Sequence, residues 1–143
     1  MTMNYLYAPE SIGDGESILK EIREIVGDDD GIEMFRDSMS LSMRLRRLDN
    51  RNVGFVVILA TKRKDLLDII SICEGFHSAD IVLLVPDGEQ ATVTLAHLLR
   101  PRFFGRMNRD LPNALNVLRK LHKKNEENQS DEWAAVGTAG KNI

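Results

Sequence analysis

Residues 53–60 form an unbroken apolar run of strand length, and Lys-Arg-Lys follows at residues 62–64. A strand that is apolar at every position is buried on both faces, as is typical of a central strand in a parallel sheet. Ligands and catalytic groups in such sheets gather just beyond the carboxyl ends of the strands. At that point the chain has Ala60, Thr61 and a basic triplet, and it has no carboxylate.

Segments of strand length alternate with segments of helical periodicity along the first 124 residues. Strands are expected near residues 3–7, 32–35, 53–60, 81–85 and 102–107. Helices are expected near residues 16–26, 40–48, 64–73, 89–99 and 110–123, with Ser38 or Ser40 capping the second. Five cycles of about 25 residues predict an α/β fold with one doubly wound, five-stranded parallel sheet in the flavodoxin-like order 2-1-3-4-5.

The composition is typical of one soluble domain with a core. Of 143 residues, 43% are hydrophobic, and the formal net charge of −3 argues against nucleic acid or an anionic membrane as the main partner. No apolar run approaches the roughly 18 residues of a membrane span, and residues 1–7 do not resemble a signal peptide. The single cysteine, Cys73, excludes an internal disulfide, so we expect a cytoplasmic protein.

The periodic pattern ends near residue 125. Residues 125–143 are first polar and then small and glycine-bearing, which predicts a disordered C-terminal tail after a domain at residues 1–124. Trp133 in this tail is either a docking anchor or a residue without a role.

Two stretches carry a resemblance to a known family. Residues 42–48, Ser-Met-Arg-Leu-Arg-Arg-Leu, run into the central strand. Residues 103–115 combine an aromatic strand, a basic residue, a short loop and a helix start that contains Pro112. Over about residues 3–123 the chain resembles the receiver domain of bacterial response regulators, which implies a role in two-component signal transduction.

The resemblance implies a defined set of catalytic groups. Receiver domains hold Mg²⁺ with an acidic pair after the first strand and accept a phosphoryl group on an Asp at the end of the third. A Ser or Thr after the fourth strand and a Lys after the fifth respond to it. A carboxylate attacks phosphorus only where a metal ion and a cation neutralise the charge that develops.

This chain departs from most of that set. It has a single acid, Glu10, after the first strand and no acid from Leu59 to Thr61. Asp87 stands where a hydroxyl is expected, and Arg106 replaces the Lys. We therefore interpret the chain as a pseudo-receiver that acts by protein–protein interaction without aspartyl phosphorylation. We expect no enzymatic activity, no cofactor and no metal ion.

The charges at the carboxyl edge of the sheet offer an alternative function. The candidate residues for contact with an anion or a partner at the degenerate phosphoryl position are Thr61, Lys62, Arg63, Lys64, Asp87 and Arg106. Such a site would bind a phosphate, a nucleotide, nucleic acid or an acidic protein segment. The simpler interpretation is a solvated helix start whose cations are neutralised by Asp65 and Asp68. Cations oppose the dipole at a helix N-terminus, which argues that something retains them.

A second surface is expected over the fourth helix, the fifth strand and the fifth helix, where receiver domains usually contact proteins. Its candidate residues are His97, Arg100, Arg102, Phe104, Arg119 and Lys120. Arginine and aromatic residues are enriched at interfaces, so a signalling partner or a homodimer is expected here. An ordinary basic surface is the alternative, and alternation leaves open whether Phe103 or Phe104 points outward.

Other polar clusters do not have the pattern of a site. Asp-Asp-Asp at residues 28–30 indicates a turn at the amino edge, with spacing unlike a calcium loop. A cation site made of Glu10, Asp14 and Asp87 would have few ligands. The three histidines lie in different elements without an adjacent nucleophile: His77, His97 and His122.

Overall fold

The computed structural model describes residues 2–28, 30–47, 53–76 and 79–137, with the backbone alone for residue 47 and residues 125–137. The expected end of the second helix at residues 48–52 lies outside the described residues, as do His77 and residues 138–143.

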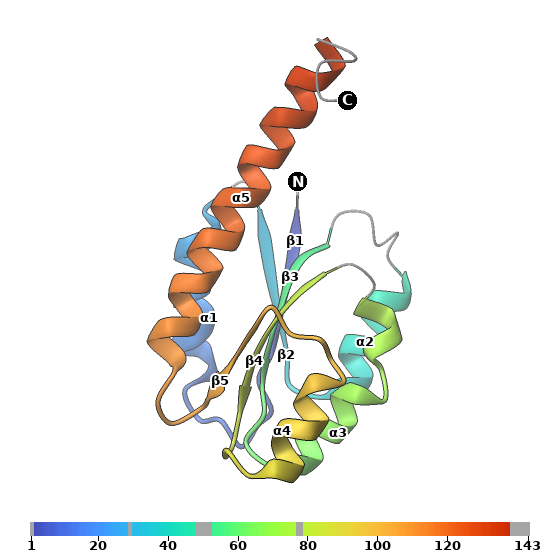
Figure 1. The fold of residues 1–143 in the computed structure, drawn as a ribbon, viewed down its shortest axis with the longest axis vertical. Helices are drawn as coiled ribbons and strands as arrows, with labels where there is room; N and C mark the ends of the chain where they lie inside the picture. The colour runs from blue at the N-terminus through green and yellow to red at the C-terminus, as the bar shows by residue number, and fades with distance from the viewer. Residues whose placement is uncertain (1, 29, 48–52, 77–78, 138–143) are drawn as a thin grey trace.

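A five-stranded parallel sheet forms the centre of the molecule (Figure 1). Its strands are β1 (Met3–Tyr7), β2 (Gly31–Phe35), β3 (Val53–Leu59), β4 (Asp80–Val85) and β5 (Phe103–Arg106). The order across the sheet is β2-β1-β3-β4-β5, so β3 is the middle strand and β5 lies at an edge. The predicted α/β fold class and strand order are confirmed.

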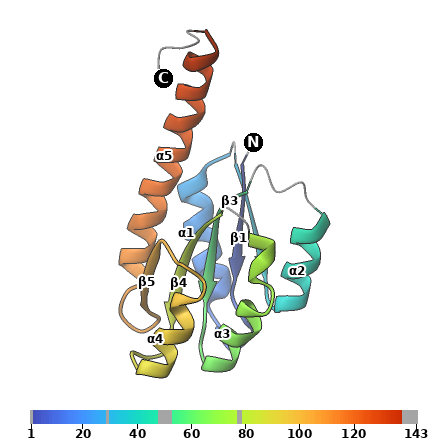
Figure 2. The same cartoon turned by 45° about the vertical axis from the view of Figure 1, so that its right-hand side comes forward.

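Helices cover both faces of the sheet (Figures 1 and 2). One face carries α1 (Gly15–Val26) and α5 (Leu111–Gly137), and the other carries α2 (Ser38–Arg47), α3 (Arg63–Ile70), the 3-10 turn η2 (Cys73–Phe76) and α4 (Gln90–His97). Within β3, Phe55, Val57 and Leu59 join the core under α1 and α5, whereas Val56 and Ile58 join the opposite core. This double burial is the reason that β3 is apolar throughout.

Two local predictions are wrong. Asp37 caps α2 in place of Ser38 or Ser40, because its carboxylate accepts the Ser40 N–H at 2.8 Å and the Ser40 hydroxyl at 2.9 Å. Cys73 lies in η2, since α3 already ends at Ile70. The Ser71 hydroxyl donates to the Asp68 carbonyl at 2.6 Å, a local bond that competes with helix continuation.

α5 continues to Gly137, beyond the expected end near residue 124, and its last part extends away from the sheet (Figure 1). Residues 125–136 contain neither Gly nor Pro, so no residue in this run stops a helix. The backbone of residues 125–137 is thus helical. The disorder predicted for residues 125–143 stays a prediction.

Polar side chains fasten the amino edge of the sheet. Asn4 is buried in β1, where its Oδ1 accepts the Phe55 N–H at 2.9 Å and its Nδ2 donates to the Gly31 carbonyl at 3.0 Å. Asp30 accepts the Thr2 N–H at 2.9 Å, and its other oxygen lies 3.4 Å from Nδ1 of His122 on α5. Asp30 thus ties chain segments together at the edge opposite the candidate site.

Candidate functional site at the carboxyl edge of the sheet

The loops that follow the strands meet at the lower edge of the sheet in Figure 1. The residue directly after β3 is Ala60, which is fully buried and donates its N–H to the Leu84 carbonyl at 2.9 Å. A methyl group therefore fills the end of the central strand, where a nucleophilic carboxylate would be required for phosphoryl transfer.

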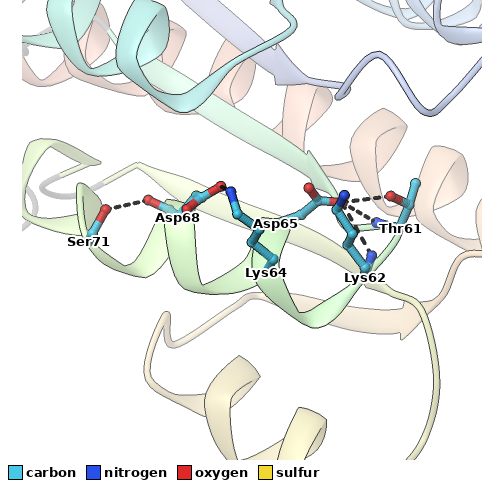
Figure 3. Close-up of polar contacts among 6 residues, drawn as sticks. All are labelled: Thr61, Lys62, Lys64, Asp65, Asp68 and Ser71. Carbon is cyan, nitrogen blue, oxygen red and sulfur yellow. Dashed lines mark hydrogen bonds and ion pairs between the residues drawn. The ribbon is translucent and has the colours of Figure 1, made fainter.

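Asp65 is the carboxylate that reaches this position, from the first turn of α3 (Figure 3). Its Oδ2 accepts the Thr61 N–H at 2.9 Å, the Thr61 hydroxyl at 2.6 Å and the Lys62 N–H at 3.2 Å. The side chain is 5% exposed. A carboxylate in the first turn satisfies free N–H groups and is stabilised by the helix dipole. Asp65 is therefore engaged in holding the loop between β3 and α3.

Ser11 extends this arrangement to the loop after β1. Its Oγ lies 2.8 Å from Oγ1 of Thr61. The Thr61 hydroxyl has one proton and donates it to Asp65, which as a carboxylate can only accept, so Ser11 is the donor to Thr61. The resulting chain of hydrogen bonds joins the loop after β1 to the loop after β3.

The basic triplet at residues 62–64 does not converge on one point. Arg63 forms an ion pair with Glu89 at 2.5 Å and donates from Nε to the Thr92 hydroxyl at 3.1 Å. Lys64 pairs with Asp68 one turn further along α3 at 3.3 Å (Figure 3). Lys62 is exposed. Its backbone N–H donates to the Asp65 carboxylate at 3.2 Å, and its carbonyl accepts the Asp65 N–H at 3.1 Å. Two of the three cations thus have carboxylate partners within the chain.

Asp87 and Arg106 flank the loop between β4 and α4. Asp87 accepts the Glu89 N–H at 2.9 Å. A hydrogen bond from Thr92, this backbone bond and the charges of Arg63 and Arg106 lower the pKa of Asp87, so it is ionised at neutral pH. The Arg106 guanidinium lies against Gly88, so close that a Cβ there would overlap its Nη2. Glycine at position 88 therefore leaves room for Arg106 in this position.

Arg36, which the sequence did not single out, extends from the end of β2 into the loop after β1. Its guanidinium donates to the Ala8 carbonyl at 3.1 Å and to the Ile12 carbonyl at 3.3 Å. Gly15 leaves room for it, because a Cβ there would overlap Nη1. Receiver domains hold Mg²⁺ after the first strand, and a fixed cation beside the Ala8 carbonyl does not fit a divalent ion at that point of this chain.

The surface predicted for partner contact falls into two parts. His97 and Phe104 lie on the α4–β5 side, where their rings are 6.0 Å apart. Leu98, which the prediction did not include, is 60% exposed on the same side. Phe104 packs against the core under α2–α4 and Phe103 against the opposite core, so each is half-buried.

Four arginine and lysine residues complete the predicted surface. Arg100 is exposed with a left-handed φ of 49°, and Arg102 pairs with Asp80 at 3.2 Å. Arg119 instead lines a groove of about 490 Å³ between α1 and α5, together with Glu21 and Glu24. Lys120 is exposed on α5. Arg119 is thus separated from the residues of α4 and β5.

Within the described part of the chain, no three His, Cys, Asp or Glu side chains are grouped so as to hold a metal ion. No helix among the described residues is long and apolar enough to cross a membrane.

No protein-family model and no curated protein matches the sequence. The crystal structure of a response regulator receiver domain from Rhodospirillum rubrum does share its architecture. The two superpose with a TM-score of 0.55 over 83% of this chain and 90% of that one, at 19% sequence identity. The chain has the fold of a receiver domain.

Two further solved structures match. A fusion of the yeast Spc42 trimeric coiled coil to another structure has a TM-score of 0.54, 12% identity and coverage of 96% of this chain and 91% of its own. The Mn²⁺-bound response regulator Rcp1 has a TM-score of 0.49, 14% identity and coverage of 82% and 90%. At 12–19% identity, a match to a solved structure concerns the fold alone.

Proposed function

We propose that this receiver fold is a noncatalytic signalling module that binds a protein partner and is not phosphorylated on aspartate. The observation that carries the proposal is the end of β3. Ala60 stands at the strand terminus, and Asp65, the carboxylate that reaches this loop, is already bound by three donors. A nucleophilic carboxylate has to be free to approach phosphorus.

Arg36 supports the same proposal from the loop after β1. Its guanidinium holds the Ala8 and Ile12 carbonyls and places a permanent positive charge there. Receiver chemistry would need a metal ion at this loop to neutralise the transferring phosphoryl group. The described side chains therefore favour a fixed loop over a metal-dependent one.

The alternative, an anion site at the basic carboxyl edge, draws on the same residues. Arg63 and Lys64 each have a carboxylate partner, and Asp87 adds negative charge beside Arg106. These pairs reduce the positive field that an anion would meet. Lys62, exposed at the start of α3, remains the residue on which this alternative rests.

A phosphorylation assay tests the proposal. The protein and an authentic receiver domain are incubated in parallel with acetyl phosphate and Mg²⁺, and intact masses are compared. We expect the receiver domain to gain a base-labile phosphoryl group and this protein to gain none. A base-labile phosphoryl adduct on this protein would overturn the proposal, and Asp65→Asn would then test whether Asp65 carries it.

The partner surface is tested with two variants that place the same charge on different exposed apolar residues. Leu98→Glu alters the α4–β5 side, and Met43→Glu, on α2, is the matched control. Proteins cross-linked in native extract should be lost with the first variant and kept with the second.

Sedimentation of the same variants tests the predicted homodimer. Nucleotide binding that falls on Lys62→Ala would support the anion alternative instead.

A further inference from the structure

Arg63 links two helices that begin at the carboxyl edge. It is the first residue of α3, yet its side chain turns away from α3 and reaches the start of α4. Nη2 pairs with Glu89, the residue that precedes α4, and Nε donates to the hydroxyl of Thr92 in the first turn of α4. One planar side chain thus holds two points of the same helix turn, as suits the rigid fork of donors in a guanidinium.

The two contacts of Arg63 differ in their surroundings. The Glu89 side chain is 69% exposed, so this ion pair is screened by water and salt. Thr92 is fully buried, so water cannot take the place of Nε as a donor to its hydroxyl. The Thr92 contact is therefore the one that is costly to lose.

The loop that leads into α4 is held from its other side. Asp87 accepts the Glu89 N–H at 2.9 Å, and the Thr92 hydroxyl hydrogen-bonds to Asp87, which fixes the loop to the helix turn that Arg63 holds. The Arg106 guanidinium covers Gly88 and connects this loop to β5. Residues from α3, the loop, α4 and β5 thus form one connected set of contacts.

We propose that Arg63 is a clamp that keeps the first turn of α4 against α3, so that the position of α4 is set by contacts within the chain. If the α4–β5 side is the partner surface, as the proposed function holds, that surface is presented without a covalent signal. The clamp itself is a property of the fold and does not depend on the identity of a partner.

Hydrogen–deuterium exchange measured by mass spectrometry tests the clamp. The full chain is compared with Arg63→Ala and with Lys64→Ala, which removes the neighbouring cation and its exposed pair with Asp68. We expect backbone amides of residues 87–97 to exchange about tenfold faster in Arg63→Ala, because the loss of a charged hydrogen bond favours local opening. Lys64→Ala should leave this segment unchanged.

Equal exchange of residues 87–97 in the two variants would overturn the proposal. A rise spread evenly over all peptides of Arg63→Ala, including β3, would also overturn it, because the effect would then be global. Thr92→Val keeps the side-chain shape and removes the hydroxyl, so it should reproduce the local rise. If Arg63→Ala does not fold, Arg63→Met, which keeps the aliphatic stem and removes both donors, decides the outcome against wild type.

The exchange experiment and the phosphorylation assay fail independently. A base-labile phosphoryl adduct with a local rise in Arg63→Ala would remove the proposed function and leave the clamp. No adduct and no local rise would leave the proposed function and remove the clamp.

Discussion

Ala60 and Asp65 together determine what the end of β3 can do. Ala60 contributes a buried methyl group, and Asp65 contributes a charge that three donors already hold. A buried carboxylate with several hydrogen bonds is a structural group, because its release would leave donors without partners. Asp65 thus stabilises the loop between β3 and the start of α3.

The ionisation of Tyr7 depends on its burial and on charged residues of the same region, including Asp65. The Tyr7 side chain is 3% exposed. Burial, followed by the charges of Asp65, Asp68 and Asp37, raises the pKa of Tyr7 from its ordinary value of 10.0 to about 12. The neutral phenol is therefore favoured in the folded state.

We predict that the unfolding free energy of wild type falls relative to Tyr7→Phe as pH rises from about 10 to 12. Below pH 10 the phenol is neutral in both the folded and unfolded states, so its contribution is fully present. Above pH 10 the unfolded chain ionises first and is favoured. Urea unfolding at several pH values measures the difference. Parallel curves for the two proteins from pH 9 to 12 would contradict the prediction.

β5 and α5 are joined by a turn in which glycine has a steric role. Gly105 is buried in β5, and a Cβ there would lie 2.6 Å from the Cβ of Asp110, just before α5. The Asp110 carboxylate accepts the Arg106 N–H at 2.7 Å, which keeps the turn tight. The close approach of strand and helix start therefore requires glycine.

We predict that Gly105→Ala destabilises the protein by about 1–3 kcal/mol, since the added methyl group forces the turn apart. Gly75→Ala is the matched control, because a Cβ there meets Leu45 at an ordinary 3.5 Å. Its effect should stay within about 1 kcal/mol. Urea denaturation of both variants checks this, and equal losses would show that the turn has room.

At the scale of the whole molecule, the first part of α5 packs on the sheet. The buried residues that it contributes to the core are Ala114, Leu115, Leu118 and Leu121. Beyond them the helix extends away from the sheet (Figure 1). Because stability follows burial, the domain boundary is expected near residue 124.

We predict that the free energy of unfolding of a chain ending at Lys124 lies within about 1 kcal/mol of that of the full chain. Leu121→Ala in the full chain is the control, and it should cost about 2–5 kcal/mol because Leu121 is 6% exposed in the core. Urea denaturation of the three proteins measures both effects. If truncation lowers the free energy of unfolding as much as Leu121→Ala does, residues 125–143 belong to the folded unit.

The sequence by itself determined the architecture and showed that no acidic residue stands at the end of β3. The apolar run of β3 requires burial on both faces, and five alternating cycles require helices on both sides of a parallel sheet. The lack of an acid from Leu59 to Thr61 is also a property of the sequence. These features depend on local periodicity and residue identity, which are readable without coordinates.

Only the tertiary structure decided the partners of the charged residues. The sequence already offered Asp68 as a partner for the basic triplet, and Lys64 pairs with it. The partners of Arg63, Glu89 and Thr92, lie 26 and 29 residues away and follow only from the fold. Arg36 reaches a loop 24 to 28 residues earlier in the chain. A long, flexible side chain selects among all acceptors within reach, and the folding of distant segments decides which acceptors those are.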